Sequence, residues 1–527
     1  MTDEMVTVAE DSVRGGFFLF SGTALSTLIL AISSIMIARL MGPELFGQYS
    51  LAFVVPQLLF VFTDLGINQG VTKFAAEQKS KNQTNSTAKL IKHGILIRAS
   101  IGILIFIINY IFAEQLATFL LQRPELAFFV RIASITILFQ TLFTIANAAF
   151  VGLDKTEYNA LATNIQAFAK TLIQILLVLS GFAVTGAIMG HVASYVVGAA
   201  AGLILLTIVL RKKTENKTTN RTFRENSRLL IHYGAPLYVF ALLGAFIPFV
   251  QNLILAIFTT DEAIGNYKAA VNFATLLTVL SIPITTALLP AFSKLNSFSN
   301  NSAKNFFRLA NKYISIIILP ATVLIIIFSN QIVQIIYGST YTTAPSFLAI
   351  YCLLYLLVGL GSLTLGGFYN GLGETSLTLR MGITTFLTLV LLSPILTNTY
   401  GVQGLIAAYL IASTAGTAYG SYKARKKFNA EFSTSSLVRI YIISAIAALP
   451  PILLTTYFPL QNILTLVIGS LIYLFVYVTL FPIARIITHT EMQNMGAVLR
   501  KIRFAGPLIT LLIRYQQMLK TKLGIDN

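Results

Sequence analysis

The chain has a single cysteine among its 527 residues, and it carries little charge. Because Cys352 is the only cysteine, an internal disulfide is impossible, and thiolates alone cannot build a metal site. Cys352 lies inside an apolar run. Asp, Glu, Lys and Arg together make up 11% of the residues. Because a soluble domain carries roughly 25% charged residues, this scarcity argues against a soluble protein.

Motifs of enzyme chemistry are also missing. There is no His-Glu-x-x-His sequence, no Gly-x-x-x-x-Gly-Lys-Ser/Thr phosphate loop and no Cys/His cluster with metal-ligand spacing. The four histidines are scattered along the chain: His93, His191, His232 and His489. We therefore expect that the protein is not an enzyme and that it uses no cofactor and no metal.

Apolar residues dominate what is present, at 56% of the chain, with a mean hydropathy of +0.78. Apolar runs of about 20 residues recur along the whole length, and each is long enough to cross a hydrocarbon core of about 30 Å. They predict an all-α polytopic membrane protein with about fourteen transmembrane helices. The predicted spans are 15–38, 47–69, 93–113, 126–151, 158–180, 184–210, 229–258, 267–290, 313–336, 345–370, 378–397, 402–421, 437–457 and 461–485.

The sequence also contains an internal repeat. Pro43-Glu-Leu-Phe-Gly47-Gln-Tyr49 returns about 218 residues later as Asp261-Glu-Ala-Ile-Gly265-Asn-Tyr267. Two further matches keep this offset: Gly152 to Thr156 with Gly371 to Thr375, and Val184 to Ala187 with Val402 to Leu405. Three ordered matches at one offset indicate a duplication. Duplicated halves of a membrane protein usually flank a substrate path, so the repeat points to transport.

The repeat predicts two pseudo-symmetric six-helix lobes and two additional C-terminal helices. Six crossings return the chain to its starting side, so the lobes share one orientation about an axis along the membrane normal. The predicted divisions are an N-terminal lobe at 1–210, a basic cytoplasmic linker at 211–228, a C-terminal lobe at 229–421, the extra helix pair at 422–485 and a cytoplasmic tail at 486–527. The mixed tail fits either an amphipathic surface helix or a solvated segment.

The formal net charge is +18, and its distribution predicts the orientation. With the N-terminus in the cytoplasm, Lys and Arg gather in the inner loops and the tail. The outer connections then hold little beyond Arg39, Arg123 and Lys268. This positive-inside pattern predicts a multi-pass protein of the cytoplasmic membrane with both termini inside. It also argues against nucleic-acid binding, which needs a basic face on a folded polar surface.

Ionisable residues inside spans are candidates for function, because each costs a few kcal/mol near the bilayer centre and tends to face a cavity. Lys170 lies in the middle of the fifth span, and His191 lies in the sixth. We predict that both face a central cavity, although structural pairing explains them as well. Asp64, near the inner end of the second span, is a candidate coupling or gate residue, or the acceptor of a local hydrogen bond. Arg39 adjoins the repeated motif and is a further cavity candidate.

Uncharged polar residues occupy the seventh and eighth spans. Gln251 and Asn252 correspond through the offset to Ser33 and Ser34, and Asn272 follows in the next span. Polar positions in equivalent spans of both halves are what a shared central path requires. Hydrogen bonding between helices explains them almost equally well.

The stretch from Ile37 to Tyr49, followed by Asp64-Leu-Gly66, resembles the opening of the polysaccharide transporter family. These are the O-antigen-type flippases of the multidrug/oligosaccharidyl-lipid/polysaccharide exporter (MOP) superfamily. The resemblance implies a V-shaped bundle around a central cavity lined by spans one, two, seven and eight. It implies translocation of a lipid-linked (polyprenyl diphosphate) oligosaccharide to the outer leaflet by alternating access. Family cavities also carry basic residues. Carried over residue by residue onto the matching stretch of spans one and two, the resemblance favours Arg39 and Asp64.

The implied partners are the lipid-linked oligosaccharide, membrane lipids and glycan-assembly enzymes, with H+ or Na+ left open as the coupling ion. Two alternatives remain within transport: a lipid II-type flippase and a cation-coupled multidrug or metabolite antiporter. An antiporter predicts acidic residues in the N-terminal lobe, where the spans offer only Asp64. A membrane glycosyltransferase would need an acidic outer loop, and the outer connections are too short for one.

Overall fold

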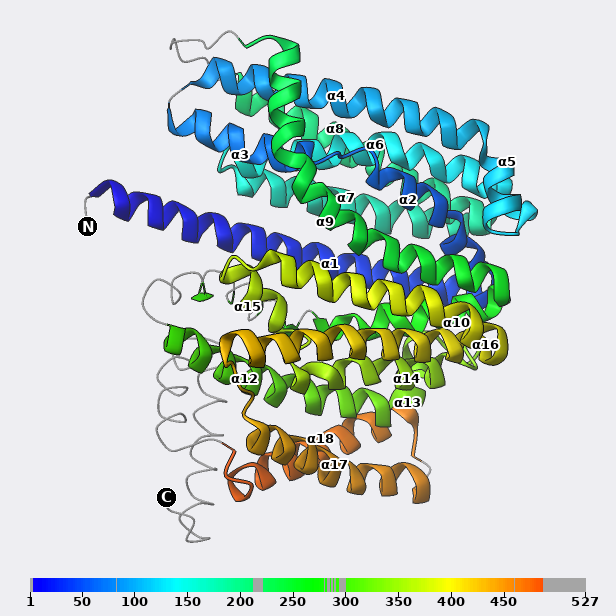
Figure 1. Ribbon diagram of the computed structural model, residues 1–527. Helices are drawn as coiled ribbons and strands as arrows, with labels where there is room; N and C mark the ends of the chain where they lie inside the picture. Colours follow the sequence, from blue (N-terminus) through cyan, green and yellow to red (C-terminus); the bar gives the residue numbers. More distant parts are fainter. Residues whose placement is uncertain are drawn as a thin grey trace. The chain divides into compact units, whose positions relative to one another are not determined.

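The protein is represented by a computed structural model that describes residues 3–81, 83–211, 221–278, 300–458 and 460–486, with isolated positions between 280 and 292. All regular secondary structure in these residues is helical (Figure 1). The predicted tail beyond residue 486 and half of the predicted linker, residues 212–220, lie outside the described residues.

The first repeat is built from long helices joined by short connections. They are α1 (Asp3–Ala52), α2 (Val54–Val61), α3 (Ile67–Ser80), α4 (Thr84–Ile111), α5 (Ala113–Gln115), η1 (Leu116–Leu120), η2 (Pro124–Leu126), α6 (Ala127–Gly152), α7 (Thr156–Leu177), η3 (Val178–Phe182) and α8 (Ala183–Leu210). Helices α4, α6, α7 and α8 lie side by side in one bundle (Figure 1).

The second repeat and the C-terminal pair follow the same pattern. Their helices are α9 (Phe223–Phe258), α10 (Asp261–Ala274), α12 (Asn300–Ile327), α13 (Ser329–Ile336), α14 (Ala344–Leu356), η4 (Leu357–Leu360), α15 (Leu365–Gly371), α16 (Thr375–Phe428), α17 (Thr434–Tyr457) and α18 (Asn462–Ile483). Helix α9 begins with a capping box, in which Thr222 accepts a hydrogen bond from the backbone N–H of Glu225.

Among the described residues, eight helices are long and apolar enough to cross a membrane, or nine if the bent pair at 344–371 is one span. Three of them are 41, 55 and 54 residues long: 21–61, 156–210 and 375–428. Since about 20 residues cross a bilayer, each of these holds two predicted spans. The chain turns inside them at Gly42, Gly181 and Gly401, where φ is 74°, 89° and 58°. Glycine adopts such positive φ values without steric cost.

The predicted spans lie along described helices, but three of them are broken: the second over α1, α2 and α3, the ninth over α12 and α13, and the tenth over α14, η4 and α15. The eighth begins on α10 and continues into residues that are only partly described. Large apolar side chains such as Phe168, Leu391 and Leu471 are more than half exposed. Exposed apolar faces on long helices fit contact with lipid. The chain is therefore an all-α, multi-pass membrane protein, as the sequence predicts.

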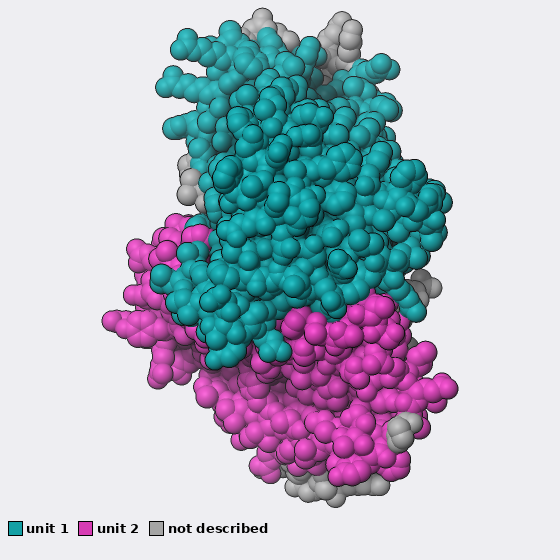
Figure 2. All heavy atoms as spheres, turned by 90° about the vertical axis from the view of Figure 1, so that its right-hand side faces the viewer, with its two compact units in different colours: residues 1–272, 390–405 teal, residues 273–389, 406–527 magenta. Residues whose placement is uncertain are grey.

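The chain forms two compact units, shown in different colours in Figure 2. Unit 1 comprises residues 1–272 and 390–405, and unit 2 comprises 273–389 and 406–527. Helix α9 and most of α10 thus belong to unit 1, although they open the second repeat in sequence. The predicted lobe boundaries stay a prediction.

Each unit has its own apolar core. In unit 1, Phe150 and Ile145 of α6 pack with Ile67 of α3 and Leu230 of α9. In unit 2, Phe307 and Phe368 lie at the centre of a cluster that also includes residues of the C-terminal pair, such as Tyr473. The additional helix pair is therefore part of the core of unit 2.

Candidate functional site

The two copies of the repeated motif pack against each other within unit 1. A Cβ atom on Gly47 would overlap the carbonyl oxygen of Asp261, and one on Gly265 would overlap the carbonyl oxygen of Pro43. Asp261 is the counterpart of Pro43 in the repeat, so the two contacts are reciprocal. This is the geometry that a two-fold relation between the halves predicts. Only glycine permits such a close approach of backbone to backbone.

Arg123 joins the same region to the first repeat. Its guanidinium donates hydrogen bonds to the carbonyls of Ala256, at 3.2 Å, and Thr259, and it lies 3.5 Å from the carboxylate of Asp261. The last carbonyls of a helix lack partners within that helix, so Arg123 caps the end of α9. The arginine and the glycine contacts together hold the connection between α9 and α10 against the first repeat.

A polar cluster, called here the junction cluster, lies where the first helices of the two repeats meet. It comprises Ser34 of α1, Asn252 of α9, and Lys268 and Asn272 of α10. Asn272 Nδ2 donates to Ser34 Oγ at 2.9 Å, and Lys268 Nζ donates to Asn252 Oδ1. Lys268 and Asn272 are one turn apart, so one face of α10 contacts both α1 and α9.

Lys268, on α10 of unit 1, is the second residue of the predicted eighth span. It follows Asp261, the first residue of α10, by seven positions, which is about 10 Å along the helix. Within the described residues, its hydrogen bond is to the neutral amide of Asn252 and no carboxylate forms an ion pair with it. The junction cluster therefore presents an uncompensated positive charge together with hydrogen-bonding groups.

A second polar group, called here the first-repeat network, joins α1, α7 and α8. Gln174 Nε2 donates to Tyr49 Oη at 3.0 Å, and Ser33 Oγ donates to Gln174 Oε1 at 3.4 Å. Tyr49 Oη lies 3.3 Å from Nδ1 of His191. The imidazole ring of His191 packs on Phe53, with ring centroids 4.3 Å apart.

Lys170 lies one turn before Gln174 on α7 and interacts electrostatically with His191. Within the described part of the chain, no hydrogen bond or ion pair involves the Lys170 ammonium group, and Nε2 of His191 is buried without a hydrogen-bond partner. The network thus contains two basic groups and no carboxylate among its described members. Both residues are half-buried. A basic group inside a membrane span without an opposite charge is costly, so its retention points to a function.

Asp64 and Arg98 form an ion pair between the α2–α3 turn and α4. Asp64 Oδ1 lies 2.7 Å from Arg98 Nη1, and it accepts the backbone N–H of Asn68 at 3.0 Å. Arg98 is fully buried, and its Nη2 donates to Thr144 Oγ1 at 2.7 Å. Asp64 therefore has both a basic partner and a local hydrogen bond, and its coupling or gating role stays a prediction.

The predicted site residues thus separate into groups. Asn252 and Asn272 belong to the junction cluster, and Lys170 and His191 belong to the first-repeat network. Gln251 is buried on α9, and its Nε2 has no partner among the described residues. Arg39 has an exposed side chain on α1. No group of three His, Cys, Asp or Glu residues in the described part of the chain could hold a metal ion.

Several residues of these groups were missed by the sequence prediction. Arg98 lies inside the predicted third span, so the depth argument that selected Lys170 applies to it equally. Lys268 lies inside the predicted eighth span but was assigned to an outer connection. Gln166, Lys170 and Gln174 recur every four residues, and this spacing places them on one face of α7. That periodicity was the available signal for the first-repeat network.

The glycine contacts predict that Gly47→Ala and Gly265→Ala separate the two motif copies, because an added methyl group overlaps a backbone carbonyl. Spin labels at the exposed positions Glu44 and Glu262, in a Cys352→Ser background, should show a longer distance distribution by double electron–electron resonance. Gly244→Ala on α9 is the matched control, since its Cβ meets no atom within 4 Å. Unchanged distances in both glycine variants would contradict the packing.

The chain is similar to curated proteins along most of its length. It is 22% identical over 488 residues to a probable low-salt glycan biosynthesis flippase of Haloferax volcanii, covering 92% of this chain and 98% of that protein. It is 23% identical over 510 residues to a teichuronic acid biosynthesis protein of Bacillus subtilis, covering 92% and 97%.

A solved structure described as a lipid II flippase in an inward closed conformation has a similar fold. The TM-score is 0.71 at 17% sequence identity, and the match covers 87% of this chain and 97% of the other. The model of the family described as polysaccharide biosynthesis protein matches residues 12–296, which is more than half of the chain. The chain belongs to this polysaccharide biosynthesis protein family.

Proposed function

We propose that the protein is a flippase that moves a lipid-linked (polyprenyl diphosphate) oligosaccharide across the cytoplasmic membrane by alternating access, for glycan biosynthesis. The observation that carries this proposal is Lys268. It places a positive charge, without a carboxylate partner among the described residues, beside Asn252 in the junction cluster. An anionic headgroup that crosses the membrane needs such a charge along its path.

The chemistry of the junction cluster suits this substrate. The polyprenyl tails can stay in the bilayer, whereas the diphosphate and the sugars need a polar path. Lys268 attracts the diphosphate, and the side chains of Asn252, Asn272 and Ser34 offer hydrogen bonds to phosphate or sugar oxygens. Neutral amides and a single ammonium group bind only moderately, which allows release once the headgroup has crossed.

Family membership and the named relatives support the glycan substrate. The relatives are described as a glycan biosynthesis flippase and a teichuronic acid biosynthesis protein, and both align over most of the chain. A lipid II-type substrate is the alternative of the same chemical class. Both substrates are polyprenyl diphosphates, so the junction cluster accommodates either, and the attached sugars distinguish them.

An antiporter for drugs or metabolites fits the described residues less well. Coupling to a metal cation and binding of a cationic drug both favour carboxylates in the cavity. Asp64, the acidic candidate of the N-terminal lobe, is paired with Arg98 at 2.7 Å. The junction cluster and the first-repeat network each contain a lysine instead.

The coupling ion that best fits the first-repeat network is a proton. A sodium ion needs several oxygen ligands, and the ammonium group of Lys170 would repel it. Lys170 and His191 can each bind and release a proton, and they interact electrostatically. Tyr49, the last residue of the repeated motif, contacts His191 and so connects this pair to α1.

In the proposed orientation both termini face the cytoplasm and the repeated motifs face outward. A cysteine at position 215 should then be labelled only from the cytoplasmic side, and a cysteine at 262 only from the outer side. The label is a membrane-impermeant maleimide applied to right-side-out and inverted vesicles in a Cys352→Ser background. Labelling of both positions from one side would contradict the orientation.

The substrate proposal predicts that Lys268→Gln lowers flipping by about tenfold, because one charge-assisted contact of about 1.5–3 kcal/mol is lost. The assay uses proteoliposomes with a polyprenyl diphosphate oligosaccharide whose outward appearance is measured by lectin binding. Lys155→Gln is the control, since Lys155 lies in the exposed α6–α7 connection.

If the unmodified protein flips no faster than empty liposomes, the function is rejected. Preference for lipid II in the same assay would favour the alternative.

The coupling proposal predicts that an imposed proton gradient accelerates flipping by the unmodified protein and that a sodium gradient does not. In Lys170→Gln the ratio of rates with and without the proton gradient should fall to about one, because a proton-binding group is lost. Lys155→Gln should keep the ratio of the unmodified protein. An unchanged ratio in Lys170→Gln, or acceleration by sodium alone, overturns this assignment.

A further inference from the structure

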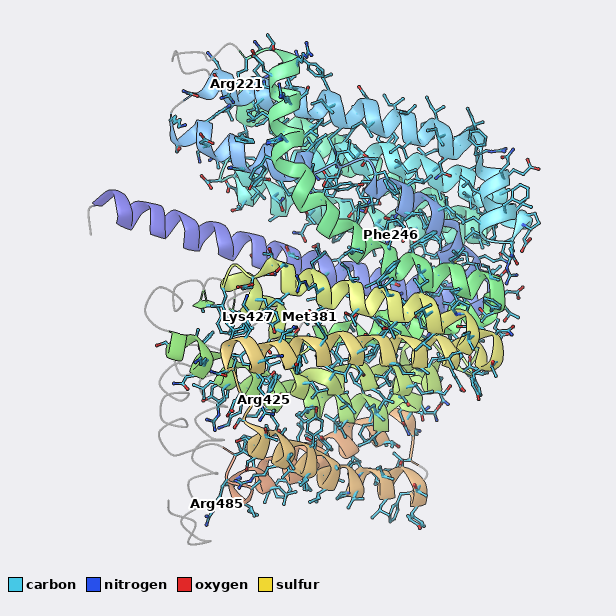
Figure 3. All side chains as sticks on the ribbon, in the orientation of Figure 1. Arg221, Phe246, Met381, Arg425, Lys427 and Arg485 are labelled. Atoms are coloured by element: carbon cyan, nitrogen blue, oxygen red, sulfur yellow. The ribbon has the colours of Figure 1, made fainter. Side chains whose placement is uncertain are left out.

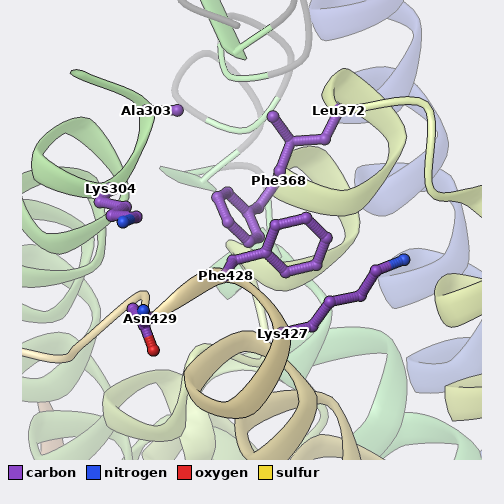
Figure 4. Close-up of a pocket in the computed structure, with 7 residues that line it drawn as sticks. All are labelled: Ala303, Lys304, Phe368, Leu372, Lys427, Phe428 and Asn429. Carbon is purple, nitrogen blue, oxygen red and sulfur yellow. The ribbon is translucent and has the colours of Figure 1, made fainter. Parts of the chain in front are cut away.

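Unit 2 contains a cavity whose lining shares no residue with the junction cluster or the first-repeat network. It has a volume of about 180 Å³ and lies between the start of α12 and the end of α16 (Figure 4). Lys304, Lys427 and Asn429 supply its polar lining, and Phe368 and Phe428 supply its apolar lining. At roughly 30 Å³ for one water, the space equals about six waters, which is enough for a phosphodiester group.

The cavity lies where helices end and basic residues gather. Helix α16 ends at Phe428 with Arg425, Lys426 and Lys427 in its last turn, and Figure 3 labels two of these arginine and lysine side chains. Lys427 pairs with Glu374 at 2.6 Å. One carboxylate therefore offsets part of a larger excess of positive charge around the opening.

The apolar lining distinguishes between two phosphate-bearing ligands. Phe368 and Phe428 meet edge to face, with ring centroids 5.6 Å apart, and Leu372 continues the apolar wall. A free phosphate ion gains nothing from aromatic and aliphatic walls. A glycerophospholipid places its phosphate against lysines and its glycerol and first methylene groups against such walls.

We propose that this cavity is a binding site for the headgroup of an anionic glycerophospholipid, with Lys304 and Lys427 on the phosphate and Phe368 and Phe428 beside the glycerol backbone. Basic pockets between transmembrane helices at the membrane surface bind anionic headgroups in this way. The site belongs to unit 2 and shares no residue with the junction cluster, and its occupancy does not depend on the substrate of transport.

The test measures lipid binding to the purified full-length protein by native mass spectrometry. Phosphatidylglycerol, phosphatidylcholine and inorganic phosphate are added separately. The unmodified protein should retain phosphatidylglycerol in preference to the other two. Lys304→Gln combined with Lys427→Gln should weaken retention by at least about fivefold, since the variant loses two charge-assisted contacts with the lipid phosphate.

Two further variants make the result decisive. Lys423→Gln combined with Lys426→Gln removes the same charge from the same end of α16 without touching the cavity lining, and it should weaken retention clearly less than the lining pair does. Ala303→Leu fills the cavity without changing the charge and should lower retention as the lysine pair does. Equal losses in both lysine pairs, or full retention in Ala303→Leu, would overturn the site. Competition by inorganic phosphate at equal concentration would identify a free-phosphate site and also overturn it.

Discussion

The reciprocal contact between the two motif copies is the constraint on which the arrangement of unit 1 depends. Gly47 meets the backbone of Asp261, and Gly265 meets the backbone of Pro43. This contact places the start of α10 against the first repeat. Asn272 of α10 can then donate a hydrogen bond to Ser34 of α1. A side chain at either glycine would separate the backbones and break up the junction cluster. Arg123 reinforces the contact by binding the final carbonyls of α9.

The polar residues of unit 1 follow from this packing and from the cost of burying charge in a membrane. Asp64 and Arg98 satisfy each other, as a buried ion pair must if it is to persist. Lys170 and Lys268 have no such partner among the described residues. The contrast makes Lys170 and Lys268 candidate functional groups, whereas the coupling or gate role of Asp64 stays a prediction. Two separate lysines also fit two separate tasks, substrate attraction at the junction and proton binding within the first repeat.

Part of the candidate site was accessible from the sequence, and the rest was not. Depth within a span selected Lys170 and His191, and the repeat offset linked Asn252 to Ser34. The offset could not show that Ser34 bonds to Asn272 and Asn252 to Lys268, because symmetry between copies does not specify partners between neighbouring helices. Arg98 also lies inside a predicted span, but the sequence prediction did not include it.

The sequence by itself determined the class of fold and the duplication. Long apolar runs can cross a membrane only as helices or closed barrels, and their lengths and the motif spacing need no tertiary information. Only the tertiary structure shows what the glycines of the repeated motif do. They are required by a contact between copies 218 residues apart, and no local property of either copy reveals that contact. The pairing of Asp64 with Arg98, and the lack of a carboxylate beside Lys268 among the described residues, were likewise decided in three dimensions, because the cost of a charge depends on what lies beside it.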